Sequence, residues 1–186
     1  MRRIFLFNMM TLDGFFAGSA GEIDWHVVDK EFNDFAVEQL QEIDTLIFGR
    51  ITYELMAAYW PTPAAVKNDP IVAERMNNLA KVVFSRTLRT VEWNNSRLVK
   101  GDAFQELWQL KKSEGRYIAI FGSANLAADL LRKGLIDELR VMVNPVILGS
   151  GRPLFGNHGG ARRLKLLGSR TFRSGNVLLR YEPADK

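Results

Sequence analysis

The chain has 186 residues, of which 47% are hydrophobic and 25% are charged, a composition that fits one globular domain with a substantial core. Its net charge of +4 comes without a long run of Lys or Arg, so a small anionic ligand is a better expected partner than nucleic acid. Because the chain has no cysteine and two histidines, disulfides, cysteine nucleophiles and metal sites built on these residues are not expected.

The N-terminal part predicts a buried strand followed by a loop. Residues 4–10 are almost continuously apolar, which is typical of a strand buried on both faces. This run is too short for a signal peptide, and no stretch has the roughly 20 apolar residues of a membrane helix, so we expect a cytoplasmic protein. Residues 11–24 contain Gly14, Gly18 and Gly21 and predict a loop.

Helices and strands are expected to alternate through the rest of the chain. Pro61 and Pro63 end the second helix because proline cannot continue one, Asp69 and Pro70 start the third, and Gly134 ends the fifth. The expected helices cover residues 30–43, 50–59, 70–79, 103–112 and 124–133. The expected strands cover residues 45–48, 81–85, 91–99 (as one or two short strands), 117–121, 139–148, 163–172 and 177–181.

This alternation predicts the fold class. Strands that alternate with helices imply a central, mostly parallel sheet with helices on both faces, which is a three-layer α/β fold. The last strands have no helix between them, so the C-terminal edge is expected to be antiparallel. Because we see no linker, repeat or low-complexity segment, residues 1–186 are expected to form a single domain.

Three strand ends are candidate anion sites. Gly49 and Gly122 each stand between a buried strand and a helix start, where free N–H groups and the helix dipole favour a phosphate. A third strand end carries Ser85 and Arg86, and Arg50 follows Gly49. Together they suit a dinucleotide that carries an extra phosphate, although any one junction alone can be only a tight turn.

Several segments in order carry a family resemblance. They are residues 10–14 (MTLDG), 48–54 (FGRITYE), 83–88 (VFSRTL), 121–124 (FGSA), 134–139 (GLIDEL) and 143–149 (VNPVILG). They resemble the dihydrofolate reductase-like family. The last two are most similar to the reductase (C-terminal) domain of bacterial riboflavin biosynthesis proteins, and the resemblance spans nearly the whole chain.

The resemblance implies a dihydrofolate reductase-like fold with bound NADPH, and it gives each candidate residue a place. The residues expected along the cofactor are Gly49, Arg50 and Thr52. Those expected near its adenosine phosphate are Ser85 and Arg86. Those expected at the pyrophosphate are Gly122, Ser123 and Ala124, with Asn125 beside them. Those expected on the nicotinamide side are Met9 and Trp25.

The activity that the resemblance implies is an NADP-dependent oxidoreductase. It would transfer hydride to a small heterocyclic substrate, such as 5-amino-6-(5-phosphoribosylamino)uracil or dihydrofolate. A non-catalytic nucleotide-binding protein that uses the same cleft is the alternative, and a nucleic-acid binder ranks last.

Two acids are candidate proton donors. Asp29 precedes the first helix on its buried side, although it can equally cap that helix. Asp13 lies in the loop after the first strand, where it can equally shape the turn with Gly14. Folate reductases place an acid on the first helix, but the position that counts back best from Gly49 is near Asn33, which argues against folate reduction.

Aromatic residues and the C-terminal strands complete the expectations. Trp25, Tyr53 and Trp60 lie around the predicted cleft, and Tyr53 and Trp60 are candidates to stack on a flat substrate, although such residues are more often in the core or at its rim.

A homodimer is expected because reductase domains of the family often pair through their C-terminal strands. Residues 141–148 are apolar enough to contribute.

Overall fold

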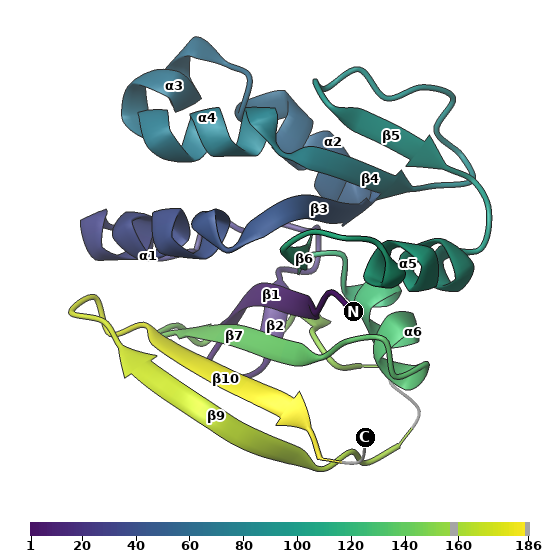
Figure 1. Cartoon of the computed structure of the whole chain (residues 1–186). Coiled ribbons are helices and arrows are strands. Elements are labelled where there is room, and N and C mark those ends of the chain that lie inside the picture. Colours follow the sequence, from purple (N-terminus) through teal and green to yellow (C-terminus); the bar gives the residue numbers. More distant parts are fainter. Residues whose placement is uncertain (157–159, 185–186) are drawn as a thin grey trace.

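Within residues 1–156 and 160–184, which the computed structural model describes, eight strands form one sheet (Figure 1). These strands are β1 (Ile4–Thr11), β3 (Ile43–Gly49), β4 (Ala80–Phe84), β5 (Ser96–Val99), β6 (Tyr117–Phe121), β7 (Glu138–Asn144), β9 (Leu164–Thr171) and β10 (Val177–Pro183). Their order in the sheet is β5-β4-β3-β6-β1-β7-β10-β9. The six strands from β5 to β7 are parallel, whereas β10 runs antiparallel to both of its neighbours.

Helices cover both faces of this sheet. They are α1 (Lys30–Gln41), α2 (Arg50–Tyr59), α3 (Pro63–Asn68), α4 (Pro70–Asn78), α5 (Ala103–Lys112) and α6 (Ala124–Arg132). Alternate residues of a strand point to opposite faces, so Phe5 and Phe48 pack under α1, α2 and α4, whereas Ile4 and Leu6 pack under α5 and α6. The expected three-layer α/β fold with an antiparallel C-terminal edge is confirmed.

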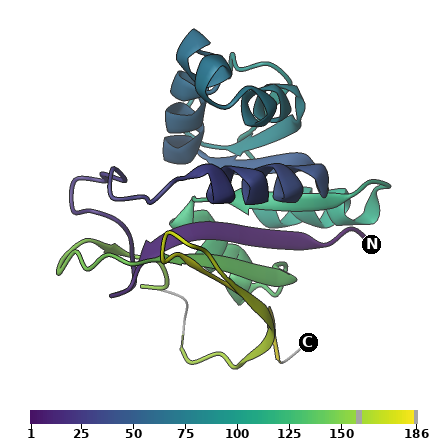
Figure 2. The same ribbon diagram turned by 90° about the vertical axis from the view of Figure 1, so that its left-hand side faces the viewer.

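The first helix joins the parallel and antiparallel parts of the sheet. Figure 2 shows α1 running beside β1, where the rings of Phe7 and Phe35 are 5.9 Å apart. Phe35 also packs with Met142 of β7 and Leu178 of β10. The helix therefore covers the boundary between the two parts and begins at the carboxyl edge of the parallel strands.

The structure differs from the sequence-based expectations in several elements. The second helix ends at Tyr59, before Pro61, as expected, but Pro63 also starts the short α3, which was not expected. The hydroxyl of Thr62 accepts a hydrogen bond from the N–H of Ala65 at 3.2 Å, and Pro63 fits the first turn of α3. Residues expected in loops form a two-stranded pair, β2 (Phe15–Ala17) and β8 (Arg152–Pro153). The strand that was expected to run to residue 148 ends at Asn144.

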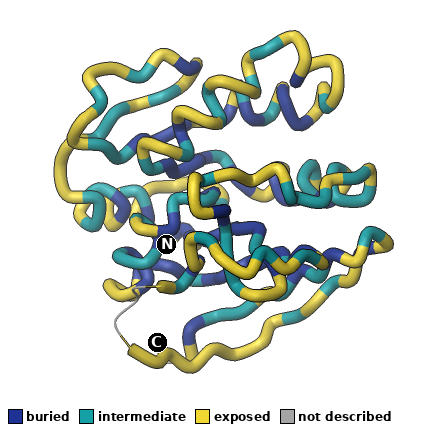
Figure 3. The backbone as a smooth tube through the Cα atoms, turned by 180° about the vertical axis from the view of Figure 1, so that it is seen from behind, coloured by how far each residue is buried: buried dark blue, intermediate teal, exposed yellow. Residues whose placement is uncertain are grey.

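Within the sheet, the central strands are buried and the antiparallel edge strand is the most exposed. Figure 3 shows the buried residues in the central strands, whereas the first half of β9 is exposed. Val141 and Met142, which were expected to contribute to a dimer, are 5% and 0% exposed because β7 lies inside the sheet, and the homodimer stays a prediction. No helix in residues 1–156 and 160–184 is long and apolar enough to cross a membrane.

Candidate functional site

Four parallel strands, β4, β3, β6 and β1, end at the same edge of the sheet, and ligands of open α/β sheets bind at such an edge. The strand register aligns Gly49 with Phe84 and Phe7 with Phe121. The segments that follow β3, β4 and β6 are therefore neighbours in space. These are the segments in which the sequence predicted anion sites.

Gly49, Thr52 and Ser123 form a hydrogen-bonded group that we call the Gly49–Thr52–Ser123 unit. The N–H of Gly49 donates to Ser123 Oγ at 2.8 Å. The N–H and the hydroxyl of Ser123 both donate to Thr52 Oγ1, at 3.0 and 3.1 Å. Because Thr52 lies in the first turn of α2 and Ser123 precedes α6, the unit fixes the starts of these two helices relative to each other.

The turn between β6 and α6 has an unusual backbone. Gly122 has a φ of +60°, and a Cβ at this position would lie 3.0 Å from Thr52 Oγ1, so a side chain here would press on the unit. Ser123 also has a left-handed φ, of +54°, which costs a residue with a side chain about 1–2 kcal/mol. The hydrogen bonds of Ser123 to Gly49 and Thr52 offset this cost and hold the turn.

The two helices that begin at this unit have no side-chain cap among the described residues. Gly49, which precedes α2, has no side chain that could cap it. Ser123 precedes α6, and its side chain accepts no hydrogen bond from the first turn of that helix. In contrast, Asp29, Thr62 and Asp102 cap α1, α3 and α5. The first-turn amides of α2 and α6, including those of Ala124 and Asn125, therefore remain available to an anion.

A cavity of about 520 Å³ lies beyond the ends of β4 and β5. Arg86, Lys100 and Lys133 line it together with Ser85, whose hydroxyl accepts hydrogen bonds from two backbone amides of the following turn. Arg86 is exposed and forms no ion pair with any residue that the structure describes. Arg50 differs, because it forms an exposed ion pair with Glu54 at 2.9 Å, a contact of low energy that a ligand can displace.

The two residues expected near the nicotinamide have different surroundings. Met9 is 9% exposed and packs in the apolar cluster under α1. Trp25 is half-buried, donates from Nε1 to the carbonyl of Glu22 at 3.3 Å and contacts the ring of His26 edge to face. Burial lowers the pKa of His26 to about 4, and its Nε2 has no hydrogen-bond partner in the described part of the chain.

Both candidate proton donors accept hydrogen bonds from backbone N–H groups. Asp29 caps α1 by accepting from the N–H of Phe32 at 2.8 Å, which is the alternative that the sequence left open. Asp13 accepts from the hydroxyl of Thr11 at 2.6 Å and from the N–H of Gly149 at 2.8 Å. The hydrogen bond from Thr11 is the largest cause that lowers the pKa of Asp13, so this carboxylate is a poor proton donor at neutral pH.

The two aromatic candidates for substrate stacking lie on the core side of α2. Tyr53 is 6% exposed, and its hydroxyl accepts from the backbone amides of Glu92 and Trp93 at 3.0 Å each. Trp60 packs at the edge of the same cluster and donates from Nε1 to the sulfur of Met56. Tyr53 has little surface left for a ligand, because its ring and hydroxyl hold the segment before β5 against α2.

A family model described as the RibD C-terminal domain matches residues 2–178. The chain belongs to the RibD C-terminal domain family. It is 36% identical over 182 residues to the uncharacterized protein YyaP of Bacillus subtilis strain 168, with 97% of this chain and 94% of that protein aligned. The resemblance expected from the sequence segments is confirmed.

Solved structures show the same fold as this RibD C-terminal domain protein. A putative riboflavin biosynthesis protein from Shewanella sp. PV-4 has a TM-score of 0.74 at 23% identity, over 97% of this chain and 98% of that one. Dihydrofolate reductase from Enterococcus faecalis, in a complex with NADP(H), has a TM-score of 0.66 at 17% identity, over 98% and 97%. The fold is therefore dihydrofolate reductase-like.

An acid that sequence reasoning missed lies between the starts of α1 and α4 in this RibD-type fold. Asp69 precedes α4, but its side chain does not cap that helix; it accepts from Asn33 Nδ2 at 2.5 Å. Asn33 is near the position where a folate reductase would carry its acid. The sequence identified Asp69 only as a helix start, because the packing of α1 on α4 that unites the two residues is tertiary.

Proposed function

We propose that this RibD C-terminal domain protein is an NADPH-dependent reductase that transfers hydride to a small nitrogen heterocycle. The Gly49–Thr52–Ser123 unit carries this proposal, since it joins two uncapped helix starts at the carboxyl edge of the sheet. Free amides and the positive ends of two helices suit the pyrophosphate of a dinucleotide. The fold shared with a dihydrofolate reductase that binds NADP(H) supports the same cofactor.

The residues around the unit fit NADPH in particular. Arg86, Lys100 and Lys133 line the cavity beyond β4 and β5, together with Asp102 and with Asp129, which pairs with Lys133 at 3.4 Å. The guanidinium of Arg86 forms no ion pair with a described residue and is well suited to the extra phosphate that distinguishes NADPH from NADH. The proposed cofactor-binding residues are Met9, Trp25, Gly49, Arg50, Thr52, Ser85, Arg86, Gly122, Ser123, Ala124 and Asn125.

The substrate half of the reaction needs a proton and an orienting group. NADPH supplies the hydride when it is bound, and the protein has to position the ring that accepts it. Asp69 fits this role because it is half-buried, Asn33 orients one carboxylate oxygen, and the other oxygen accepts no hydrogen bond from a described residue. We propose that Asp69 binds N–H groups of a substrate such as 5-amino-6-(5-phosphoribosylamino)uracil or dihydrofolate.

A nucleotide-binding protein without turnover is the second candidate. The engagement of Asp13 and Asp29 in backbone hydrogen bonds favours it, because neither acid is then free to deliver a proton. The two candidates make the same prediction for cofactor binding. They differ in whether NADPH is oxidised when a substrate is added.

Cofactor selectivity tests the proposal. Arg86→Gln should weaken NADPH binding by about 10- to 100-fold, because hydrogen bonds to charged groups contribute about 1.5–3 kcal/mol. Binding of NADH should not change, and Arg89→Gln, at an exposed arginine of the same loop, is the matched control. Equal weakening of NADPH and NADH, or no weakening of either, would contradict the assignment of the phosphate site.

Turnover is measured by the loss of NADPH absorbance on addition of dihydrofolate or the ribosylaminopyrimidine. Asp69→Asn should then lower the rate most at low substrate concentration while leaving NADPH binding intact. NADPH binding without oxidation by either substrate would support the nucleotide-binding alternative.

A further inference from the structure

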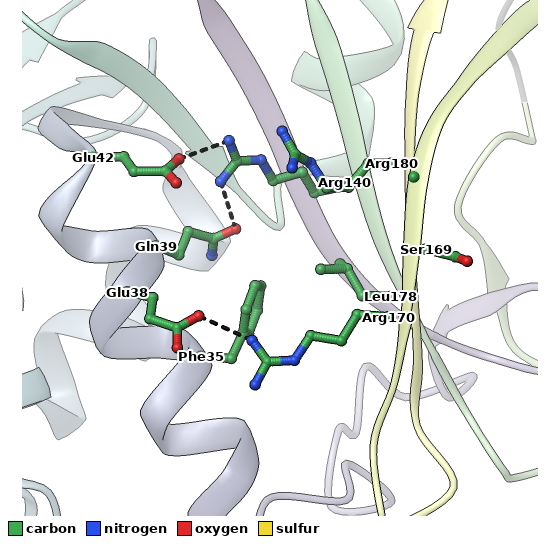
Figure 4. A pocket seen from close by; sticks show the side chains of 10 residues that line it. Phe35, Glu38, Gln39, Glu42, Arg140, Ser169, Arg170, Leu178 and Arg180 are labelled. Atoms are coloured by element: carbon green, nitrogen blue, oxygen red, sulfur yellow. Dashed lines mark hydrogen bonds and ion pairs between the residues drawn. The ribbon is translucent and has the colours of Figure 1, made fainter.

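Three arginines gather on one face of the antiparallel edge, beneath the second half of α1 (Figure 4). Arg140 of β7 lies directly opposite Arg180 of β10 in the register. Arg170 of β9 lies opposite Leu178, two residues from Arg180, and is therefore its diagonal neighbour. Like charges on opposed positions of neighbouring strands are destabilising, so this arrangement needs compensation.

Carboxylates supply the compensation. Oε1 of Glu138 accepts from Nε of both Arg140 and Arg180 at 2.8 Å, and Glu138 is 1% exposed. Glu38 of α1 and Glu42, which follows this helix, both pair with the sheet: Glu42 with Arg140 at 2.8 Å and Glu38 with Arg170 at 2.9 Å. The three positive and three negative charges therefore balance, and the network ties α1 to β7, β9 and β10.

One arginine of this network keeps free donors. Arg180 uses Nε for Glu138, while its two terminal nitrogens donate to no acceptor among the described residues, and its side chain is 44% exposed. The hydrogen bond that Arg180 donates to Glu138 raises the pKa of Arg180, so it stays charged at any ordinary pH. The pair of terminal N–H groups is the fork that matches a carboxylate or a phosphate oxygen pair.

The free fork borders a cavity of about 210 Å³ between α1 and the strands. Figure 4 shows the guanidinium groups of Arg140 and Arg180 close together at one end of this cavity and the Arg170–Glu38 pair at the other. Phe35 and Leu178, which are 6% and 3% exposed, lie between the two ends and give the cavity an apolar floor. The site thus combines oxyanion donors with a small apolar floor.

We infer that this cavity binds one small organic anion, with an oxyanion group on the Arg180 fork and a flat apolar body on Phe35 and Leu178. Arg140, whose side chain is 4% exposed, adds the buried positive charge behind the fork. The site does not share a lining residue with the cavity at Arg86, so it is separate from the proposed cofactor site. Because the charges of the network already balance, the free donors and the apolar floor have to supply the affinity.

Benzoate is the probe that tests this inference, with neutral benzamide as its isosteric control. Saturation-transfer NMR on the full chain, with each compound at up to tens of millimolar, should detect benzoate and not benzamide. Arg180→Gln should abolish the benzoate signal, whereas Arg163→Gln, at an exposed arginine just before β9, should leave it unchanged. NADPH affinity should be the same in both variants, which separates this inference from the proposed function.

Glu138 keeps Arg140 as a partner in the Arg180→Gln variant, so this variant should fold. If it does not, amide shifts of the wild-type chain on benzoate addition replace it, and they should be largest at residues 168–170 and 178–180. Absence of benzoate binding, equal binding of benzamide, or shifts confined to the carboxyl edge would overturn the inference.

Discussion

Replacing Thr52 by Val removes one hydroxyl and keeps nearly the same side-chain shape. Thr52 Oγ1 accepts from the N–H and from the hydroxyl of Ser123, so the substitution deletes two hydrogen bonds of the Gly49–Thr52–Ser123 unit. At about 0.5–1.5 kcal/mol for each, the free energy of unfolding should fall by about 1–3 kcal/mol. Ser123 also loses support for its left-handed φ of +54°, so the start of α6 should relax.

Two assays on Thr52→Val separate the structural effect from the effect on binding. Urea unfolding gives the loss of stability, and a fluorescence titration with NADPH gives the change in affinity. We expect weaker NADPH binding, because the amides of α2 and α6 are no longer held in one arrangement. Thr90→Val is the control, because Thr90 is exposed and its side chain forms no hydrogen bond with a described residue. If the two variants have equal stability and equal NADPH affinity, the reasoning about the unit is refuted.

Two further predictions concern buried titratable groups outside the unit. Lys81 is 1% exposed and donates to three backbone carbonyls at 2.8–3.0 Å. Lys81→Met should therefore destabilise the chain by about 1–3 kcal/mol, measured by urea unfolding with tryptophan fluorescence. Burial lowers the pKa of His26 from 6.5 to about 4, so the unfolded chain binds the proton more tightly and stability should fall as the pH drops from about 6.5 to 4. The urea midpoint, plotted against pH across this range, should show a slope that His26→Gln removes. An equal slope in the wild-type chain and in the variant would contradict the assignment to His26.

The strand ends that we propose as the cofactor site could be predicted because they depend on local sequence. Gly49 ends β3 after the apolar run 46–48, and Gly122 follows the apolar strand β6; such runs identify buried parallel strands without knowledge of their partners. Ser123 was also predicted at this edge. Its hydrogen bonds to Gly49 and Thr52 were not, because they join residues 71–74 positions apart.

Other features depend on packing that the sequence does not specify. Apolar residues lie all around α2: Tyr53 is buried, whereas Ile51 and Leu55 are 54% and 51% exposed, so periodicity alone could not decide which side faces the core. Lys100 reaches the cavity at Arg86 because β5 adds in parallel to β4. Such pairing is set by tertiary contacts rather than by local propensity.

The most direct test of the central claim is an NMR titration of the isotope-labelled chain with NADPH. The account predicts saturable binding, with the largest amide shifts in the first turns of α2 and α6, at Ile51, Ala124 and Asn125, and a second group at Ser85 and Arg86. Absence of saturable binding, or largest shifts away from these two helix starts, would contradict the account.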